Sequence, residues 1–184
     1  TANGDPQAST NLPFGERSWY FDDASSYNIT AGLSSLNFSG SDFTIEAFIY
    51  LDSDTNSVIA RRGRYAAGDS EYSFEYESGG SLLLELTTDG TATGRTTFTT
   101  TNTMAVGQWH HVAACYDTTA NKVYLAIDGA VEETSYSSTT HSDTGVVGIG
   151  ATNNGGDNFD GYISNLRMVK GNALYTANFD SPTS

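Results

Sequence analysis

Two adjacent histidines and the only cysteine of the chain lie in one short segment, where they could form a catalytic or metal-binding cluster. His110 and His111 precede Cys115 in the stretch GQWHHVAACYD, residues 107–117. A thiol nucleophile needs its base within about 3 Å, and a zinc site needs a tetrahedral set of nitrogen or sulfur ligands. Whether either site can form depends on the conformation of the segment.

Residues 109–117 have the composition of a β-strand, in which successive side chains point to opposite faces. His110 and His111 would then point apart. At about 3.3 Å per residue, the Cα atoms of His111 and Cys115 would lie roughly 13 Å apart, which excludes a local Cys–His dyad. Zinc is disfavoured as well, because opposed histidines cannot easily chelate one ion and the chain has no second cysteine to complete a tetrahedral site. We expect Cys115 to be a small buried side chain and one histidine to be hydrogen-bonded in or near the core.

The rest of the chain follows the same all-β pattern. From Ser18 onward, runs of β-branched and aromatic residues are separated by Gly, Asn, Asp and Ser, without a helical period. The pairs Asp128-Gly129 and Gly79-Gly80 predict tight hairpins between antiparallel strands. The clearest strands are predicted at 18–21, 42–51, 57–62, 71–77, 81–87, 109–117, 122–128, 146–150 and 159–170.

The predicted strand 42–51 has two dissimilar faces. Alternation places on one face Phe43, Ile45, Ala47, Ile49 and Leu51. It places on the other face Thr44, Glu46, Phe48 and Tyr50. Because the second face is not simply polar, we expect this strand to lie mid-sheet beneath a second layer or to line a concave surface. A sandwich of two antiparallel sheets accounts for both faces.

Length and charge limit the organisation and the partners of the chain. Its 184 residues predict one domain over residues 17–184, preceded by an extended N-terminal arm or linker at 1–16, which holds two of the three prolines. The formal net charge of −14 and the absence of a basic stripe argue against nucleic acid. Since no run approaches the roughly 20 apolar residues of a membrane span, no membrane insertion is expected. The start at Thr1 leaves a processed terminus and an excised module as alternatives.

The order of several motifs resembles the laminin-G-like members of the concanavalin A-like lectin/glucanase superfamily. These motifs run from about Ser18 to Phe179 and are TIEAFIY, GQWHHVAACYD, VYLAIDGAVEE, VVGIGA and FDGYISNLRMVKGNALYTANF. The closing segment is most similar to such domains in virion proteins of marine bacteriophages, on tail fibres or as capsid decorations. The resemblance implies a jelly-roll sandwich of two antiparallel sheets, a fold that carries lectins, enzymes and structural parts alike.

The stretch EYSFEYE resembles the paired carboxylates that glucanases of this superfamily carry on one strand. Alternation places Glu71, Ser73, Glu75 and Glu77 on one face. Ser73, however, stands where those enzymes have the middle aspartate, and the run continues into a Gly-Gly turn. A retaining glycosidase needs two carboxyl groups about 5 Å apart. We therefore expect a solvated strand face here and a protein that is not an enzyme.

The resemblance also implies calcium, bound by loop carboxylates and backbone carbonyls at an edge of the sandwich. The candidate metal ligands are Asp22 and Asp23, after the first predicted strand, and Asp160 in the last one, with Asp157 nearby. The two ends are expected to lie close together in a jelly roll. The alternative is that these aspartates cap turns through their own side chains.

Sugar binding usually combines an aromatic plate with planar hydrogen-bonding groups, and the loops at 61–70 and 151–158 supply both. The candidate ligand-binding residues are Arg64, Tyr65, Asp69, Asn153, Asn154 and Asp157. A different role is expected for Arg167, which we predict to pair with Glu46 for structural reasons.

These patterns together predict a non-enzymatic domain of a virion or another extracellular surface, which decorates the particle, binds host carbohydrate, or does both. A homo-oligomer or a repeated place in an assembly is expected, with the arm at 1–16 reaching a neighbour. The alternatives are a carbohydrate-binding module of a secreted bacterial enzyme, a purely architectural cement protein and a glycosidase.

Overall fold

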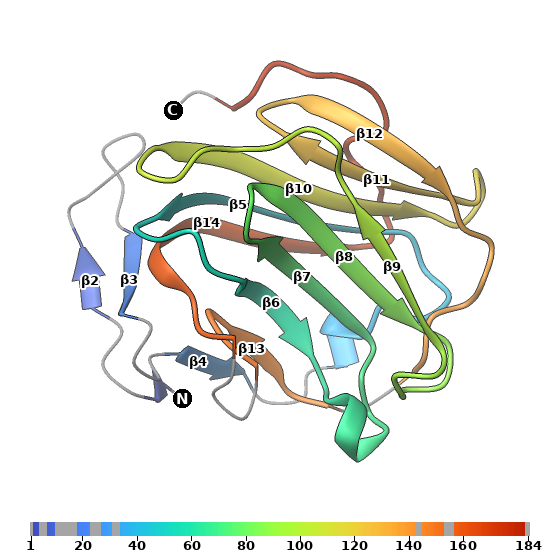
Figure 1. The fold of residues 1–184 in the computed structure, drawn as a ribbon. Helices are drawn as coiled ribbons and strands as arrows, with labels where there is room; N and C mark the ends of the chain where they lie inside the picture. Colours follow the sequence, from blue (N-terminus) through green and yellow to red (C-terminus); the bar gives the residue numbers. More distant parts are fainter. Residues whose placement is uncertain are drawn as a thin grey trace.

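The alternating segments form two antiparallel sheets that pack face to face (Figure 1). The computed structural model describes residues 18–22, 34–142, 145–152 and 157–182, together with the backbone of strands at 2–3, 7–9 and 27–30. Within these residues the all-β fold class and the two-sheet jelly-roll sandwich expected from the sequence are confirmed. None of the helices in these ranges is long and apolar enough to cross a membrane.

Each sheet has seven strands within the described ranges. Sheet A has the order β1 (Ala2–Asn3), β4 (Tyr27–Thr30), β13 (Val147–Ile149), β6 (Ser57–Arg62), β7 (Tyr72–Glu77), β8 (Ser81–Thr87) and β9 (Arg95–Thr99). Sheet B has the order β12 (Ala130–Ser135), β11 (Lys122–Ile127), β10 (Trp109–Asp117), β5 (Phe43–Leu51), β14 (Asp160–Lys170), β3 (Ser18–Asp22) and β2 (Gln7–Ser9). Two short 3-10 helices are η1 (Ser34–Leu36) and η2 (Tyr65–Ala67).

Both predicted hairpins are confirmed. Asp128 and Gly129 have positive φ angles of 49° and 82° and join β11 to β12. Gly79 and Gly80 have φ angles of 99° and 102° and join β7 to β8. Positive φ is the backbone conformation that tight hairpin turns require.

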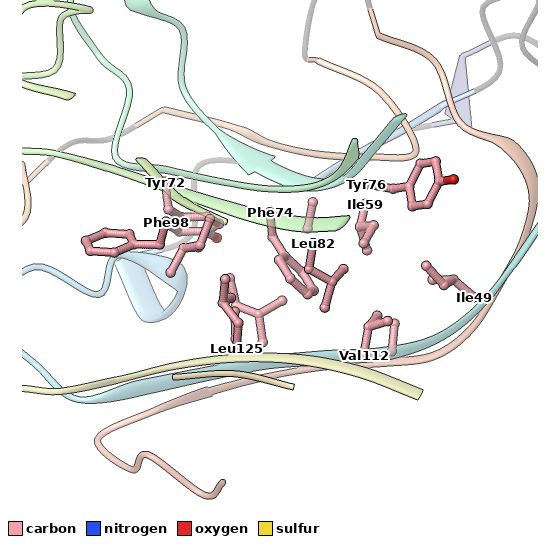
Figure 2. Close-up of a cluster of buried hydrophobic side chains, with 14 of the residues drawn as sticks. Ile49, Ile59, Tyr72, Phe74, Tyr76, Leu82, Phe98, Val112 and Leu125 are labelled. Carbon is pink, nitrogen blue, oxygen red and sulfur yellow. The ribbon is translucent and has the colours of Figure 1, made fainter. Parts of the chain in front are cut away.

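The core lies between the two sheets and uses the apolar face predicted for β5. Phe43, Ile45 and Ile49 have no exposed surface. Figure 2 shows Ile49 of β5 and Val112 of β10 on one side of the core, facing Phe74 of β7 on the other. Since burial of a large apolar side chain contributes about 1.5–3 kcal/mol, this layer fixes the register of both sheets.

The expected N-terminal arm contains two strands that add to the sheets of its own domain. Ala2–Asn3 pairs with β4 in sheet A, and Gln7–Ser9 pairs with β3 in sheet B. The remaining residues of 1–16 lie outside the described ranges.

The solvated face expected for EYSFEYE is wrong at Glu71 and Ser73, whose side chains are fully buried. Glu71 turns into the end of the sandwich, where its Oε2 lies 3.1 Å from Nε of Arg62 and its Oε1 accepts a hydrogen bond of 2.5 Å from Phe38 N–H. Arg62 is fully buried as well, so an acid in this position is an internal partner for a buried cation. Alternation alone could not reveal that partner.

Candidate functional site

The outer face of sheet B carries a group of aromatic and polar side chains that could meet a ligand. It is built from the central strands β10, β5 and β14, which pair so that Trp109 and Tyr162 flank Tyr50, and Arg167 lies opposite Glu46. The mixed outer face predicted for β5 is thus confirmed, with Phe48 buried and Tyr50 half-buried. What covers this face decides which of its side chains can act.

Residues 171–182, which we call the C-terminal strap, fold back over part of this face. The backbone of the strap meets Thr44 twice, because Thr44 Oγ1 donates to Asn172 O and accepts from Leu174 N–H, both at 2.9 Å. Farther along, Phe179 N–H donates to Gly129 O at 3.0 Å. Figure 1 shows the strap, in red, beside the β11–β12 hairpin. The strap therefore covers the Thr44 end of β5.

Glu46 is the polar centre beneath the strap and is 6% exposed. Its Oε2 accepts hydrogen bonds from His111 Nε2 at 3.0 Å and from Tyr175 O–H at 2.6 Å, and its Oε1 accepts one from Arg167 Nε. The predicted Arg167–Glu46 pair is confirmed. Burial acts to raise the pKa of Glu46, but the hydrogen bonds from His111, Tyr175 and Arg167 outweigh it and lower that pKa.

Glu46 should therefore stabilise the fold in a pH-dependent way. A carboxyl group whose pKa is lower in the folded state contributes stability above its ordinary pKa of 4.5, and this contribution is lost as the pH falls through the folded value. We expect the stability difference between wild type and Glu46→Gln to be largest above about pH 5 and to shrink in acid. Urea unfolding between pH 3 and 7 measures it, with the exposed Glu133→Gln as control. A difference that does not change with pH would contradict this account.

A cavity of about 240 Å³ lies beside Glu46, between the sheet and the strap. Its lining residues are Glu46, Ala47, Phe48, His111, Asn165, Arg167, Tyr175 and Pro182. His111, only 2% exposed, packs against Phe48, Tyr175 and Phe179 with ring centroids 5.0, 5.7 and 5.6 Å away. Its Nδ1 has no hydrogen-bond partner in the described part of the chain. The cavity thus combines an aromatic wall with an unused polar atom.

Four half-buried rings on the same outer face form what we call the aromatic platform: Tyr20, Tyr50, Trp109 and Tyr162. The ring of Tyr162 lies 4.9 Å from Tyr20, 5.7 Å from Tyr50 and 6.2 Å from Trp109, measured between centroids. On β5, Tyr50 lies two residues after Phe48 and therefore on the same outer face. On β10, Trp109 lies two residues before His111, again on the outer face. The sequence pattern placed Tyr50 on the mixed face of its strand but did not bring it together with Trp109 or Tyr162, because strand adjacency is not a local signal.

Three carboxylates lie at the end of the platform, and two of them are predicted metal ligands. Asp22 and Asp160 are cross-strand neighbours, and Asp52 N–H donates to Asp160 O at 2.9 Å. Burial and the charge of Asp160 raise the pKa of Asp52. Asp23, the third predicted ligand, lies outside the described residues. The end of β3 and the start of β14, which were expected to lie close together, are therefore side by side.

The described residues do not by themselves complete a calcium site, because no three of their His, Cys, Asp or Glu side chains are arranged to hold a metal. Calcium stays a prediction for Asp22, Asp23 and Asp160. If it is correct, 10 mM CaCl₂ should raise the melting temperature by about 5 °C over EDTA, because a cation that binds only the folded state stabilises it. Asp160→Asn should remove that shift, and magnesium should not reproduce it. Equal melting temperatures in CaCl₂ and EDTA would contradict it.

The ligand-binding residues predicted in the loop at 61–70 belong to sheet A, whereas the cavity and the aromatic platform belong to sheet B. Asp69 Oδ1 accepts a hydrogen bond from the backbone N–H of Arg64 at 2.5 Å, which closes the loop. Tyr65 lies against the outer face of sheet A, where its O–H donates to Glu85 at 2.5 Å and the Arg61 guanidinium lies 4.5 Å from its ring centroid. Arg64 itself is exposed.

The second predicted loop lies at the opposite end of β6. Asp157 O accepts from Val58 N–H at 3.0 Å, whereas Arg64 follows the other end of that strand, about 20 Å away along the chain. Asn153 and Asn154 lie outside the described residues. The structure therefore does not gather Arg64, Tyr65 and Asp69 with Asp157 at one place.

Known proteins share this architecture. A family model described as the concanavalin A-like lectin/glucanases superfamily matches residues 22–174. No curated protein matches the chain in sequence. Domain 4 of AbnA, an extracellular arabinanase from Geobacillus stearothermophilus, in complex with arabinotriose, has a TM-score of 0.71 at 15% identity over 95% of this chain and 79% of that chain.

Two further structures are similar at lower TM-scores. The CBM40 of the Ruminococcus gnavus IT-sialidase, bound to α2,3-sialyllactose, has a TM-score of 0.60 at 18% identity over 73% of this chain and 78% of that chain. Domains LG4–5 of the mouse laminin α1 chain have a TM-score of 0.60 at 20% identity, over 89% of this chain and 44% of that chain. This chain therefore spans less than half of the laminin structure, and at these identities the likeness shows the fold alone.

Proposed function

The chain belongs to the concanavalin A-like lectin/glucanases superfamily, and from this premise we propose that it is a non-enzymatic domain that binds carbohydrate on the outer face of sheet B. The observation that carries the proposal is the cavity lined by Phe48, His111 and Arg167, on the same sheet face as the aromatic platform. Sugar rings stack their C–H faces on aromatic side chains, and their hydroxyl groups bond to fixed polar atoms. Both kinds of contact are available on this one face.

The arrangement fits a saccharide chain better than a compact ligand. The cavity is smaller than the pockets that hold drug-sized molecules, so it suits one sugar unit. The next units would lie over Tyr50, Trp109 and Tyr162, which continue outward along the same strands. Two of the similar structures hold saccharides, arabinotriose and α2,3-sialyllactose, and this supports a carbohydrate as the ligand class here.

The buried position of Glu71 supports a non-enzymatic role. A glycosidase on this strand would need Glu71 and Glu75 to flank a glycosidic bond. Glu71 has no exposed surface and is engaged by Arg62 and Phe38, so its carboxyl group does not face a substrate. We expect no release of reducing sugar from polysaccharides. Activity lost in Glu75→Gln would favour the glycosidase alternative.

The setting we propose is a virion or another extracellular surface, with the domain repeated by symmetry so that weak glycan contacts add up. The support is the similarity of the closing segment, residues 162–179, to virion domains of marine bacteriophages. A carbohydrate-binding module of a secreted enzyme would use the same face. Finding a catalytic domain on the same polypeptide would favour that alternative.

A glycan array probed with the purified protein, with and without EDTA, tests the proposal. We expect binding to a restricted set of glycans, and dependence on EDTA would connect binding to the predicted metal. If the protein binds no glycan on an array of broad composition and makes a large buried contact with other virion proteins, a purely architectural cement protein is favoured.

A further inference from the structure

Asn165 interrupts strand β14 in a left-handed conformation, with a φ angle of 51°. The pairing with β5 shifts at this point, because Ser164 lies opposite Phe48 while Arg167 lies opposite Glu46. One extra residue on β14 therefore forms a β-bulge, a feature that re-aims side chains and is common beside binding sites. The bulge returns Arg167 to its pairing position opposite Glu46 and places Asn165 at the cavity.

Glycine would adopt the positive φ of this bulge at least as easily as asparagine. A positive φ strains residues that have a Cβ atom, and glycine is the usual residue in such bulges. Asparagine tolerates a positive φ better than other residues that have a Cβ atom. Since glycine would satisfy the backbone equally well, the presence of an amide side chain calls for a separate role. Asn165 is exposed and makes no side-chain hydrogen bond within the described ranges. Its amide therefore has no structural function that the fold displays.

Most polar atoms that line the cavity are already used inside the protein. Both oxygens of Glu46 accept hydrogen bonds, and Tyr175 O–H and Arg167 Nε supply two of them. His111 donates through Nε2 to the same carboxylate, which leaves Nδ1 as the second ring nitrogen, without a hydrogen-bond partner in the described part of the chain. Among the described residues, the Asn165 amide and His111 Nδ1 are thus unsatisfied groups of this cavity, and the half-exposed Arg167 guanidinium adds further N–H donors beside them.

We propose that Asn165 and His111 are the specificity-determining pair of the site, and that they bind two adjacent hydroxyl groups of the sugar unit in the cavity. This inference rests on the proposed carbohydrate-binding function. The amide offers an acceptor and two donors, and Nδ1 offers one further hydrogen-bonding atom; because a hydroxyl group can donate or accept, the pair can satisfy both hydroxyls of a diol. The ligand class is a saccharide whose terminal unit carries a free vicinal diol.

The first test is on the ligand side and needs no variant. The probes are the methyl glycosides of arabinose, galactose and mannose, each beside monodeoxy analogues that lack one hydroxyl of the diol. We expect wild type to bind at least one parent glycoside about tenfold more tightly than its monodeoxy analogue, as measured by NMR titration, because the analogue leaves a polar group unpaired. Equal affinities for parent and analogue overturn the inference.

The second test is Asn165→Gly, which keeps the backbone geometry and deletes the amide. We expect its melting temperature to lie within about 2 °C of wild type or above it. Its affinity for the selected parent glycoside should fall about tenfold, and its discrimination against the monodeoxy analogue should disappear. The matched control is Asn121→Gly, because Asn121 has a similar φ of 55° in the β10–β11 turn and does not line the cavity. This control should bind as wild type does.

The outcomes separate the inference from the proposed function. If wild type binds a parent glycoside and Asn165→Gly keeps both affinity and discrimination, the inference is overturned while carbohydrate binding stands. If Asn165→Gly is strongly destabilised, the amide has a structural role and the inference is likewise overturned. If wild type binds no glycan at all, the proposed function fails and the inference fails with it.

Discussion

Replacing Glu71 by alanine should lower the free energy of unfolding by about 3–5 kcal/mol, the range typical of breaking a buried ion pair on one side. The reason is that Arg62, fully buried and 3.1 Å from the Glu71 carboxylate, would keep its charge and lose this counter-ion. The hydrogen bond from Phe38 N–H would be lost as well. Urea or thermal unfolding at pH 7 measures the effect. A loss below about 1 kcal/mol would show that water or another group compensates Arg62.

The matched variant Glu71→Gln keeps the acceptor for Phe38 and removes the charge. Burial raises the pKa of Glu71 to about 7, against the opposing effects of Phe38 N–H and Arg62. Between its ordinary pKa of 4.5 and about 7, the folded state holds more protons at this group than the unfolded state. The stability it contributes therefore falls as the pH rises through this window, by at most about 1.4 kcal/mol per pH unit.

Glutamine does not titrate, so the stability of Glu71→Gln relative to wild type should improve as the pH rises from 4.5 to 7 and change little above that range. Urea unfolding of both proteins at several pH values measures the trend. The opposite trend would mean that Arg62 holds the pKa of Glu71 below its ordinary value, as in an ion pair whose attraction exceeds the effect of burial.

Replacing Trp109 by alanine should reduce glycan affinity about 100-fold, which is the loss expected for an aromatic residue at the centre of a binding surface. Trp109 lies 5.8 Å from Tyr50 and 6.2 Å from Tyr162 between ring centroids, and it precedes the cavity residue His111 on β10 by two positions. Its removal would therefore take away the stacking surface next to the cavity and loosen the two tyrosines that remain.

The chain provides its own control, because Trp19 is the other tryptophan and is 50% exposed on strand β3. It lies opposite Ile163, one position out of phase with the Tyr20–Tyr162 pair, so it is not part of the platform. Trp19→Ala should leave glycan affinity unchanged when both variants are titrated with the best ligand from the array. If Trp19→Ala loses binding and Trp109→Ala keeps it, the binding surface lies at the β3 edge of sheet B and the proposed site is wrong.

Much of the fold follows from the alternation of side chains along each strand, which has a period of two residues. Alternation correctly separated His110 from His111 and excluded a Cys–His dyad: Cys115 is buried, its Sγ lies 3.3 Å from Thr44 Oγ1, and His111 bonds to Glu46 instead. It also predicted the two faces of β5. The turn residues located both hairpins, because a tight turn needs positive φ angles and the residues that tolerate them, asparagine, aspartate and glycine, can be read from the sequence.

The site was harder to predict, because its parts come from strands far apart in the sequence. The pairing of Arg167 with Glu46 was anticipated, but not the third and fourth partners, His111 and Tyr175, nor the strap that brings Tyr175 over the sheet. The loop residues Arg64, Tyr65 and Asp69 were chosen by composition, and the structure places them on the other sheet.

The local pattern of residues is enough to show which side of each strand is apolar, because successive side chains of a β-strand point to opposite faces whatever surrounds it. What each face meets depends on how the strands are ordered and how the two sheets pack. The strand order of sheet B brought Tyr20 and Tyr162 to Tyr50 and Trp109, and the packing of the two sheets buried Glu71 against Arg62. These contacts form because burial of apolar surface brings together segments that are far apart in the sequence, and the pattern within one strand does not show which segments will meet.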